Sequence, residues 1–176
     1  VDNKEVHIQS LFLELEFNIL DKNIDLCLAF RRDAHIISYG SDKKFDANEC
    51  SAWFESLQKD PLSGFQHVIL DNHIVGQIEF RSHFQENNNA GYINLLYLLP
   101  TYRRKGIGKK IQNYVFSTFL ANGCFSAYLR YLPRNVSAEK FYINTGWTPV
   151  GLPNQRGQLM TQEISHVASL NYTSSE

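Results

Sequence analysis

The segment Leu98–Lys110 carries the residue types that best suit binding of a phosphate chain. Gly106 and Gly108 stand where an apolar stretch gives way to a helical pattern. Glycine allows backbone angles that turn successive N–H groups toward one point, and it leaves room for a ligand against the main chain. Five cationic side chains lie between Arg103 and Lys110, and the N-terminus of the following helix adds partial positive charge. The segment therefore predicts a polyphosphate-binding loop.

Two common phosphate motifs do not fit this loop. A P-loop requires Ser or Thr directly after its lysine, but Lys110 follows Lys109. A dinucleotide fingerprint requires a third small residue and an acid about 20 residues later. Ile111 occupies the place of the small residue, and no Asp or Glu occurs between Lys110 and Ala138. Taken alone, the segment fits an alternative interpretation equally well, in which a solvated basic loop and an amphipathic core helix bind no ligand.

A second group of polar and aromatic residues follows the loop after one further predicted strand. It consists of Asn135, Ala138, Phe141, Tyr142, Gly146 and Trp147. The loop itself has the form Arg–x–x–Gly–x–Gly over residues 103–108. With both groups in this order and at this separation, the sequence resembles the GNAT superfamily of CoA-dependent N-acetyltransferases. The resemblance covers roughly residues 65–164.

The resemblance implies a site for acetyl-CoA. The strands over residues 92–99 and 126–132 are expected to separate and admit the pantetheine arm between them. Backbone groups near Tyr97 and Leu98 are expected to pair with that arm. The side chain of Asn135 is expected to bind the cofactor, although Asn is also a common helix cap. The main-chain amides expected to hold the pyrophosphate belong to Arg103, Arg104, Lys105, Gly106, Ile107, Gly108 and Lys109.

The resemblance also implies two catalytic tasks, protonation of the leaving thiolate and removal of a proton from the amine. Tyr142 is expected to act as the general acid near the sulfur, while a core aromatic is its alternative role. Glu79 is the candidate base, with His83 as a second candidate and a water relay as an equal alternative. Asn94 stands where some members of the superfamily carry a Glu. Because none of the cysteines stands beside a matched histidine, we expect direct transfer.

The pattern of the whole chain predicts a mixed α/β domain. A strand is expected over 11–17 and a hairpin over 65–80, with its turn at 71–73. The strand, helix and strand over 92–132 form a βαβ unit with parallel strands. We therefore expect a mostly antiparallel twisted sheet of about six to seven strands, flanked by helices, with one splayed parallel pair. Helices are predicted from a cap at Asn23 or Asp25 to Phe30, over 47–58 after a cap at Asp46, and over 107–121 and 137–145, before a last hairpin over 148–164.

Size and composition fit one ordinary globular domain. The 176 residues are expected to form a single domain over 1–164 and a polar tail over 165–176. The 17 Lys and Arg nearly cancel the 18 Asp and Glu, which argues against nucleic acid or an anionic membrane as a partner. No apolar run approaches a membrane span, and the three cysteines form no Cys-x-x-Cys pair. We expect a cytoplasmic protein without a metal.

The function predicted from these features is that of an enzyme. It would be an N-acetyltransferase that moves an acetyl group from acetyl-CoA to a primary amine in a ternary complex. The acceptor is a small-molecule amine or a protein amine, and a homodimer is compatible with the sequence. The alternative is a CoA-binding regulatory or degenerate module without transferase activity. A nucleotide-binding enzyme is a third option, disfavoured by the two motif failures.

Overall fold

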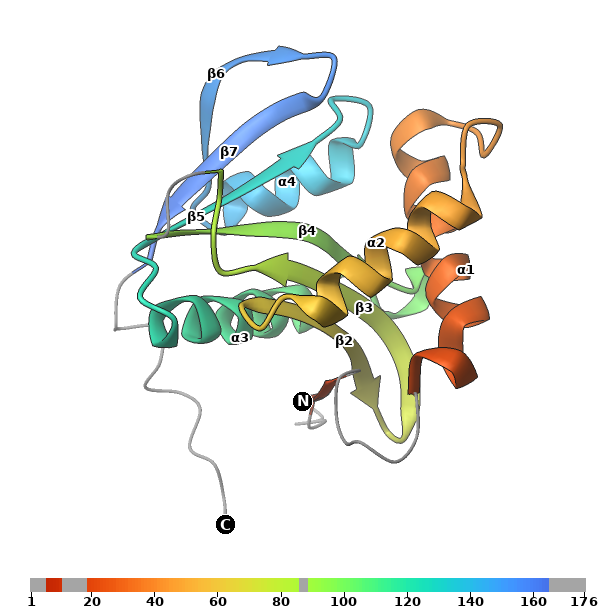
Figure 1. Ribbon diagram of the computed structural model, residues 1–176. Coiled ribbons are helices and arrows are strands. Elements are labelled where there is room, and N and C mark those ends of the chain that lie inside the picture. The colour runs from red at the N-terminus through yellow and green to blue at the C-terminus, as the bar shows by residue number, and fades with distance from the viewer. Residues whose placement is uncertain (1–5, 11–18, 86–88, 165–176) are drawn as a thin grey trace.

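The computed structural model describes residues 6–10, 19–85 and 89–164. Within these ranges the chain forms one seven-stranded sheet with helices on both faces (Figure 1). The strands are β1 (Val6–Ser10), β2 (Ser63–Leu70), β3 (His73–Arg81), β4 (Ala90–Leu98), β5 (Ser126–Tyr131), β6 (Thr148–Asn154) and β7 (Gly157–Glu163). The helices are α1 (Ile19–Tyr39), α2 (Ala47–Lys59), α3 (Ile107–Ala121) and α4 (Val136–Asn144), with a short 3-10 turn, η1 (Pro100–Tyr102), ahead of α3.

The order of strands across the sheet is β1-β2-β3-β4-β5-β7-β6. All neighbouring strands are antiparallel except β4 and β5, which run parallel. The final hairpin joins the sheet through its second strand, because β7 lies between β5 and β6. The predicted mixed sheet with one parallel pair is confirmed.

The helices divide between the two faces of the sheet. Ile111, Val115 and Phe119 of α3 are fully buried in the larger apolar core on one face. On the other face, Phe54 of α2 stacks on Phe65 of β2, with ring centroids 4.7 Å apart. Figure 1 shows α2 crossing the sheet on the side opposite α3. The sheet therefore separates α2 from α3.

A β-bulge interrupts β4 near its middle. Glu79 of β3 lies opposite Leu95. The next residue, Phe80, lies opposite Ile93. Asn94 is therefore an extra residue in β4 without a counterpart on β3. Such bulges bend a strand and redirect its side chains, often beside a functional site.

The bulge reverses the alternation of side chains along β4. Gly91 and Tyr97 would share a face in a regular strand, since side chains alternate. A Cβ on Gly91 would collide with the Phe119 ring of α3. The ring of Tyr97, in contrast, lies 5.0 Å from that of Phe30 on α1. The inserted Asn94 thus shifts the alternation, so that Gly91 and Tyr97 face opposite layers.

The first helix differs from the sequence prediction. It begins before Asn23 and Asp25, so neither is its N-cap, and it runs past Phe30 to Tyr39. It ends at Gly40, which has a φ of 80°, the left-handed region that favours glycine. The charged residues at 31–33 interrupt the apolar pattern, and the prediction stopped there although none of them breaks a helix. The strand predicted over 11–17 lies outside the described residues.

The later predicted boundaries agree closely with the structure. Asp46 caps α2, and its Oδ1 accepts hydrogen bonds from the N–H groups of Asn48 at 2.8 Å and Glu49 at 3.1 Å. The β2–β3 hairpin turns at Asp71 and Asn72, with φ values of 50° and 60°. Both predictions depended on short-range signals, which is why they were accurate.

Candidate active site

β4 and β5 separate just beyond the bulge. Their parallel ladder covers residues 90–93 and 126–129 and then stops. From Asn94 onward, the edge of β4 that faces β5 has no strand against it among the described residues, because the rest of β5 pairs with β7 alone. Main-chain groups on this edge that no strand pairs can bind an extended ligand, although the Leu98 carbonyl already accepts a hydrogen bond from Arg103. The predicted splayed pair is confirmed.

The start of α3 presents main-chain N–H groups that have no acceptor among the residues that the structure describes. Gly106 is the N-cap and has a φ of 79°, so a side chain there would be strained. The first bond of the helix runs from Lys110 N to Gly106 O at 3.3 Å, which leaves the N–H groups of residues 107–109 unpaired within the helix. At Gly108, a Cβ would lie 3.1 Å from ring carbons of Phe141. This helix end is suited to an anion.

One cavity of about 710 Å³ connects the loop, the gap between strands and α1. Neither Lys105 nor Ile107 lines it, since Ile107 is buried in the core and Lys105 places Nζ 5.6 Å from the centre of the Tyr102 ring. Glu79 does not line it either. The other sequence-predicted site residues do, namely Tyr97, Leu98, Arg103, Arg104, Gly106, Gly108, Lys109, Asn135 and Tyr142.

Arg103 and Tyr97 brace the phosphate loop against β4 and α1. Arg103 donates from Nε to the Leu98 carbonyl at 2.7 Å, and its guanidinium lies 5.5 Å from the centre of the Tyr97 ring. The Tyr97 hydroxyl donates to Asp33 Oδ2 of α1 at 2.5 Å. Burial, followed by this hydrogen bond, raises the pKa of Tyr97 far above its usual value. The Arg103 side chain is therefore a structural brace, whereas Arg104 is exposed beside the cavity.

Asn135 uses only part of its side chain to cap α4. Its Oδ1 accepts a hydrogen bond from Ala138 N at 3.1 Å. Its Nδ2 has no hydrogen-bond acceptor within the described ranges, and the residue lines the cavity. The cap found in the structure thus leaves the amide donor available, so capping and ligand binding are compatible at this position.

Tyr142 brings a protonated phenol to the cavity. Its ring packs against aromatic neighbours, with centroids 5.4 Å from Phe141, 5.9 Å from Trp147 and 6.1 Å from Tyr131. Its hydroxyl makes no hydrogen bond to any part of the chain that the structure describes. Burial, with a smaller contribution from Tyr92, raises the pKa of Tyr142 to about 12. The group is therefore a proton donor across the neutral range.

Glu79 is buried behind the wall of the cavity. Its carboxylate accepts from Trp53 Nε1 at 2.6 Å and from Gln77 Nε2 at 2.8 Å. Arg31 of α1 donates to it from Nε at 3.0 Å and also from Nη2. Glu79 has no exposed surface, whereas Arg31 has 24% of its side chain exposed and lines the cavity. Sequence analysis missed Arg31, because the helix carrying it was predicted to end one residue earlier.

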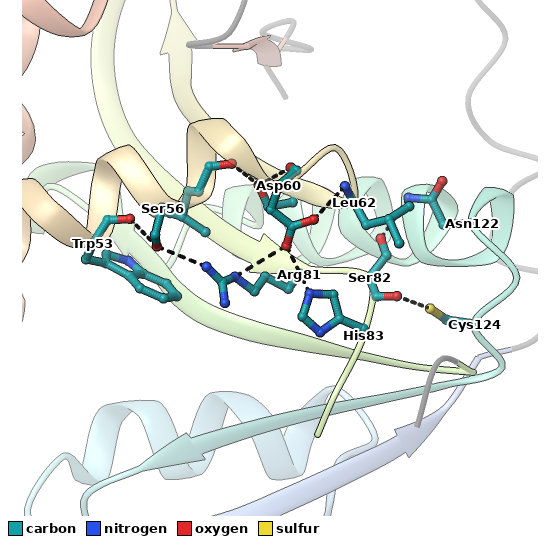
Figure 2. A network of polar contacts seen from close by, with 11 residues as sticks. Trp53, Ser56, Asp60, Leu62, Arg81, Ser82, His83, Asn122 and Cys124 are labelled. Carbon is teal, nitrogen blue, oxygen red and sulfur yellow. Dashed lines mark hydrogen bonds and ion pairs between the residues drawn. The ribbon is translucent and has the colours of Figure 1, made fainter. Parts of the chain in front are cut away.

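His83, the second candidate for the base, belongs to a polar network away from the cavity. Figure 2 shows its ring directed at Asp60, with Nε2 2.9 Å from Oδ2, while Arg81 Nε lies 3.6 Å from the same oxygen. Burial acts to raise the pKa of Asp60. The hydrogen bonds from His83 and Leu62 N–H and the nearby positive charges outweigh it and hold this pKa below its usual value. The network joins the end of α2 to β3, and His83 does not line the cavity.

Within the described ranges, no group of three or more His, Cys, Asp and Glu side chains is arranged to hold a metal ion. The helices in this part of the chain also lack the length and apolarity needed to cross a bilayer.

A glycine loop at a helix N-terminus, beside a sheet that opens between parallel strands, is the arrangement implied by the resemblance to CoA-dependent acetyltransferases. The model of the family described as "Acetyltransferase (GNAT) family" matches residues 26–147. This match spans well over half of the chain, and the chain belongs to the GNAT acetyltransferase family. A comparison with curated proteins found no match.

Solved structures of other acetyltransferases share the fold. The PaiA N-acetyltransferase of Thermoplasma acidophilum, in complex with coenzyme A, has a TM-score of 0.70 and 17% identity over 90% of this chain and 99% of that chain. YncA of Salmonella typhimurium, with its cofactor acetyl-CoA, has a TM-score of 0.66 and 13% identity over 98% of each chain. AAC(6')-Ib, in complex with ribostamycin and coenzyme A, has a TM-score of 0.68 and 13% identity over 97% of this chain and 99% of that chain.

Proposed function

We propose that the protein is an N-acetyltransferase that transfers the acetyl group of acetyl-CoA to a primary amine by direct attack. The observation that carries this proposal is the meeting of the glycine loop, the open edge of β4 and the Tyr142 phenol on one cavity. The cysteines support direct transfer. Cys27 and Cys124 are buried, and burial raises the pKa of the Cys50 thiol, which does line the cavity. A thiol that stays protonated is a poor nucleophile.

The side of the cavity formed by the start of α3, the open edge of β4 and α4 is the cofactor side. Its groups suit acetyl-CoA in charge and shape. The N–H groups of Gly108 and Lys109 and the side chains of Arg104 and Lys109 would hold the diphosphate. The open edge of β4 would pair with the pantetheine amides, as a strand does with its neighbour. The free Nδ2 of Asn135 would donate to a carbonyl of the same arm. Acetyl-CoA supplies the activated acetyl group, and these contacts fix its thioester in the gap.

Tyr142 would serve the departing sulfur. The amine nitrogen attacks the thioester carbon, the carbon–sulfur bond breaks, and the sulfur receives a proton from the phenol. A model thiol has a pKa of about 8.5, well below that of Tyr142, so transfer in water would be unfavourable. The sulfur leaves into the same buried surroundings, however, and these also raise its pKa. The phenol can therefore stabilise the developing charge by a hydrogen bond and then by its proton.

The amine would meet Asn94 rather than a carboxylate. Glu79 remains a sequence prediction as the base, but its oxygens already accept hydrogen bonds from Arg31, Trp53 and Gln77. Asn94 lines the cavity, and its buried Oδ1 has no hydrogen-bond partner in the described parts of the chain. A buried oxygen of this kind is costly unless a ligand donates to it. We assign it to orienting the amine N–H, while water carries the proton to solvent.

An acetyl-CoA turnover screen against a panel of amines, read as released thiol, tests this function. The expected result is thiol release that requires both acetyl-CoA and an amine, with an acetylated amine detected by mass spectrometry. A protein that binds CoA tightly but acetylates no amine would instead be the regulatory module that the sequence left open. A protein that fails to bind CoA would overturn both.

A further inference from the structure

The side of the cavity lined by α1, α2 and their connection, where the acceptor would bind, is the acceptor side. It contains an arginine, Arg31, that is already held in place. Two nitrogens of Arg31 donate to the fully buried Glu79, which Trp53 and Gln77 hold from other directions. A free arginine loses up to about 2 kcal/mol of rotamer entropy when a ligand fixes it. In Arg31 this cost is met on folding, so the side chain is prepared for a ligand before one arrives.

The contact with Glu79 occupies only one edge of the guanidinium group. An arginine has five N–H donors, and Glu79 accepts from Nε and from one hydrogen of Nη2. Nη1 and the second hydrogen of Nη2 have no acceptor among the residues that the structure describes. They form the other edge of the planar group, and the residue lines the cavity. Two parallel donors at this spacing match the two oxygens of a carboxylate.

We propose that this free edge of Arg31 binds a carboxylate on the acceptor, so that the acceptor is an amino acid or another amine with a carboxylate near its nitrogen. The inference rests on the proposed N-acetyltransferase function and names the class of its second substrate. Arg31 acts here as a specificity-determining residue, and Glu79 as the residue that positions it.

The other ionisable side chains around this end are compatible with a zwitterion. Asp46 and Glu49 could attract the ammonium group, although one oxygen of Asp46 is used to cap α2. The Arg31–Glu79 pair has no net charge, so recognition of the carboxylate depends on directed hydrogen bonds more than on long-range attraction. The ionisable groups of α1, α2 and their connection that line the cavity are Arg31, His35, Lys44, Asp46, Glu49, and the Tyr39 and Cys50 side chains.

Matched acceptors test this inference on the wild-type protein. L-Amino acids with aliphatic, aromatic, acidic and basic side chains are compared with their carboxamides and with the amines left after decarboxylation. For at least one side chain, kcat/KM for the amino acid should exceed that for both partners by about 10- to 100-fold, the range for losing a charge-assisted hydrogen-bonded contact. Equal or better turnover of the carboxamides or plain amines overturns the inference and leaves the proposed function intact. Turnover of no carboxylate-bearing amine also overturns it.

Two variants separate recognition from folding. Arg31→Met combined with Glu79→Gln removes both charges and so avoids a buried unpaired carboxylate. This double variant should bind CoA like the wild type but turn over an amino acid and its carboxamide at nearly equal kcat/KM. Arg31→Lys keeps the charge without the paired donors, and the preference should fall there too. A preference that survives in a folded variant of either kind overturns the assignment to Arg31, whereas loss of CoA binding by the wild type would contradict the proposed function itself.

Discussion

The two sides of the cavity hold their polar groups in different ways. On the cofactor side much of the site is main chain. Within the described residues, the N–H groups of residues 107–109 have no acceptor, and the edge of β4 beyond Asn94 has no neighbouring strand. Arg104 and Lys109 are exposed beside them. On the acceptor side the important groups are side chains tied to one another. Glu79 accepts hydrogen bonds from Arg31, Trp53 and Gln77. The first side is built from backbone geometry and the second from contacts between distant residues.

This difference predicts that the two sides tolerate substitutions differently. A site made of main-chain groups depends on a few glycines and on the path of the chain, so most of its side chains can vary. A site made of interlocked side chains loses several contacts when one residue changes. We therefore expect substitutions on the cofactor side to affect binding without unfolding the protein, and substitutions on the acceptor side to affect stability as well.

The largest effect is expected from Gly108→Glu, which should abolish CoA binding. The new side chain would place a negative charge where the diphosphate is expected, and its Cβ would press on the Phe141 ring. Gly108→Ala makes the same contact with Phe141 without the charge and should retain most of the affinity. Calorimetric titration with CoA on both folded variants checks this. Unchanged affinity in Gly108→Glu would place the cofactor elsewhere.

The next largest effect is expected from Tyr142→Phe, which should lower kcat by about 10²–10⁴-fold, the usual range for general acid catalysis. Only the hydroxyl is lost, so folding and CoA affinity should be preserved. Single-turnover kinetics should be used, because slow product release would hide the effect. A change in the chemical step of less than about twofold would make Tyr142 a packing residue.

On the acceptor side, Glu79→Gln should reduce the free energy of unfolding by about 2–4 kcal/mol, because it leaves Arg31 without its buried counter-charge and introduces a donor facing donors. Urea unfolding measures this. Glu55→Gln, in an exposed pair with Lys59, is the control and should have little effect. The pH dependence of kcat in the same variant tests the predicted base. If Glu79 is the general base, Glu79→Gln should remove the acidic limb of the profile. If Glu79 only positions Arg31, that limb should remain.

How much of each side could be predicted from sequence follows from the range of its interactions. The loop glycines and the segment that ends at Trp147 are local patterns, and they predicted the parallel pair, the glycine loop at the start of α3 and Tyr142 as a cavity residue. Glu79 was chosen as the nearest carboxylate on the hairpin, but its partner Arg31 lies 48 residues away. No local pattern could show that contact, nor the extra residue Asn94 that redirects β4.

A smaller effect is expected on the pH dependence of stability. His67 is 2% exposed, and burial lowers its pKa from an ordinary 6.5 to about 4. Between these values the unfolded chain binds more protons than the folded chain. Stability should therefore be full above about pH 6.5 and fall by about 2–3 kcal/mol as the pH is lowered toward 4. His67→Gln should remove much of this slope in urea unfolding at pH 7.5 and 5, whereas His73→Gln, at the exposed start of β3, should keep it. An equal slope in His67→Gln would contradict the assignment.

The claim on which the whole account depends is that the start of α3 holds the diphosphate of CoA, and two adjacent lysines allow it to be tested. Lys109 lines the cavity, whereas Lys110 does not, and both are exposed. Calorimetric titration with CoA should show binding to the wild type, a loss of about tenfold or more in Lys109→Glu, and a change within about twofold in Lys110→Glu. Absence of CoA binding to the wild type, or equal weakening by both substitutions, would contradict it.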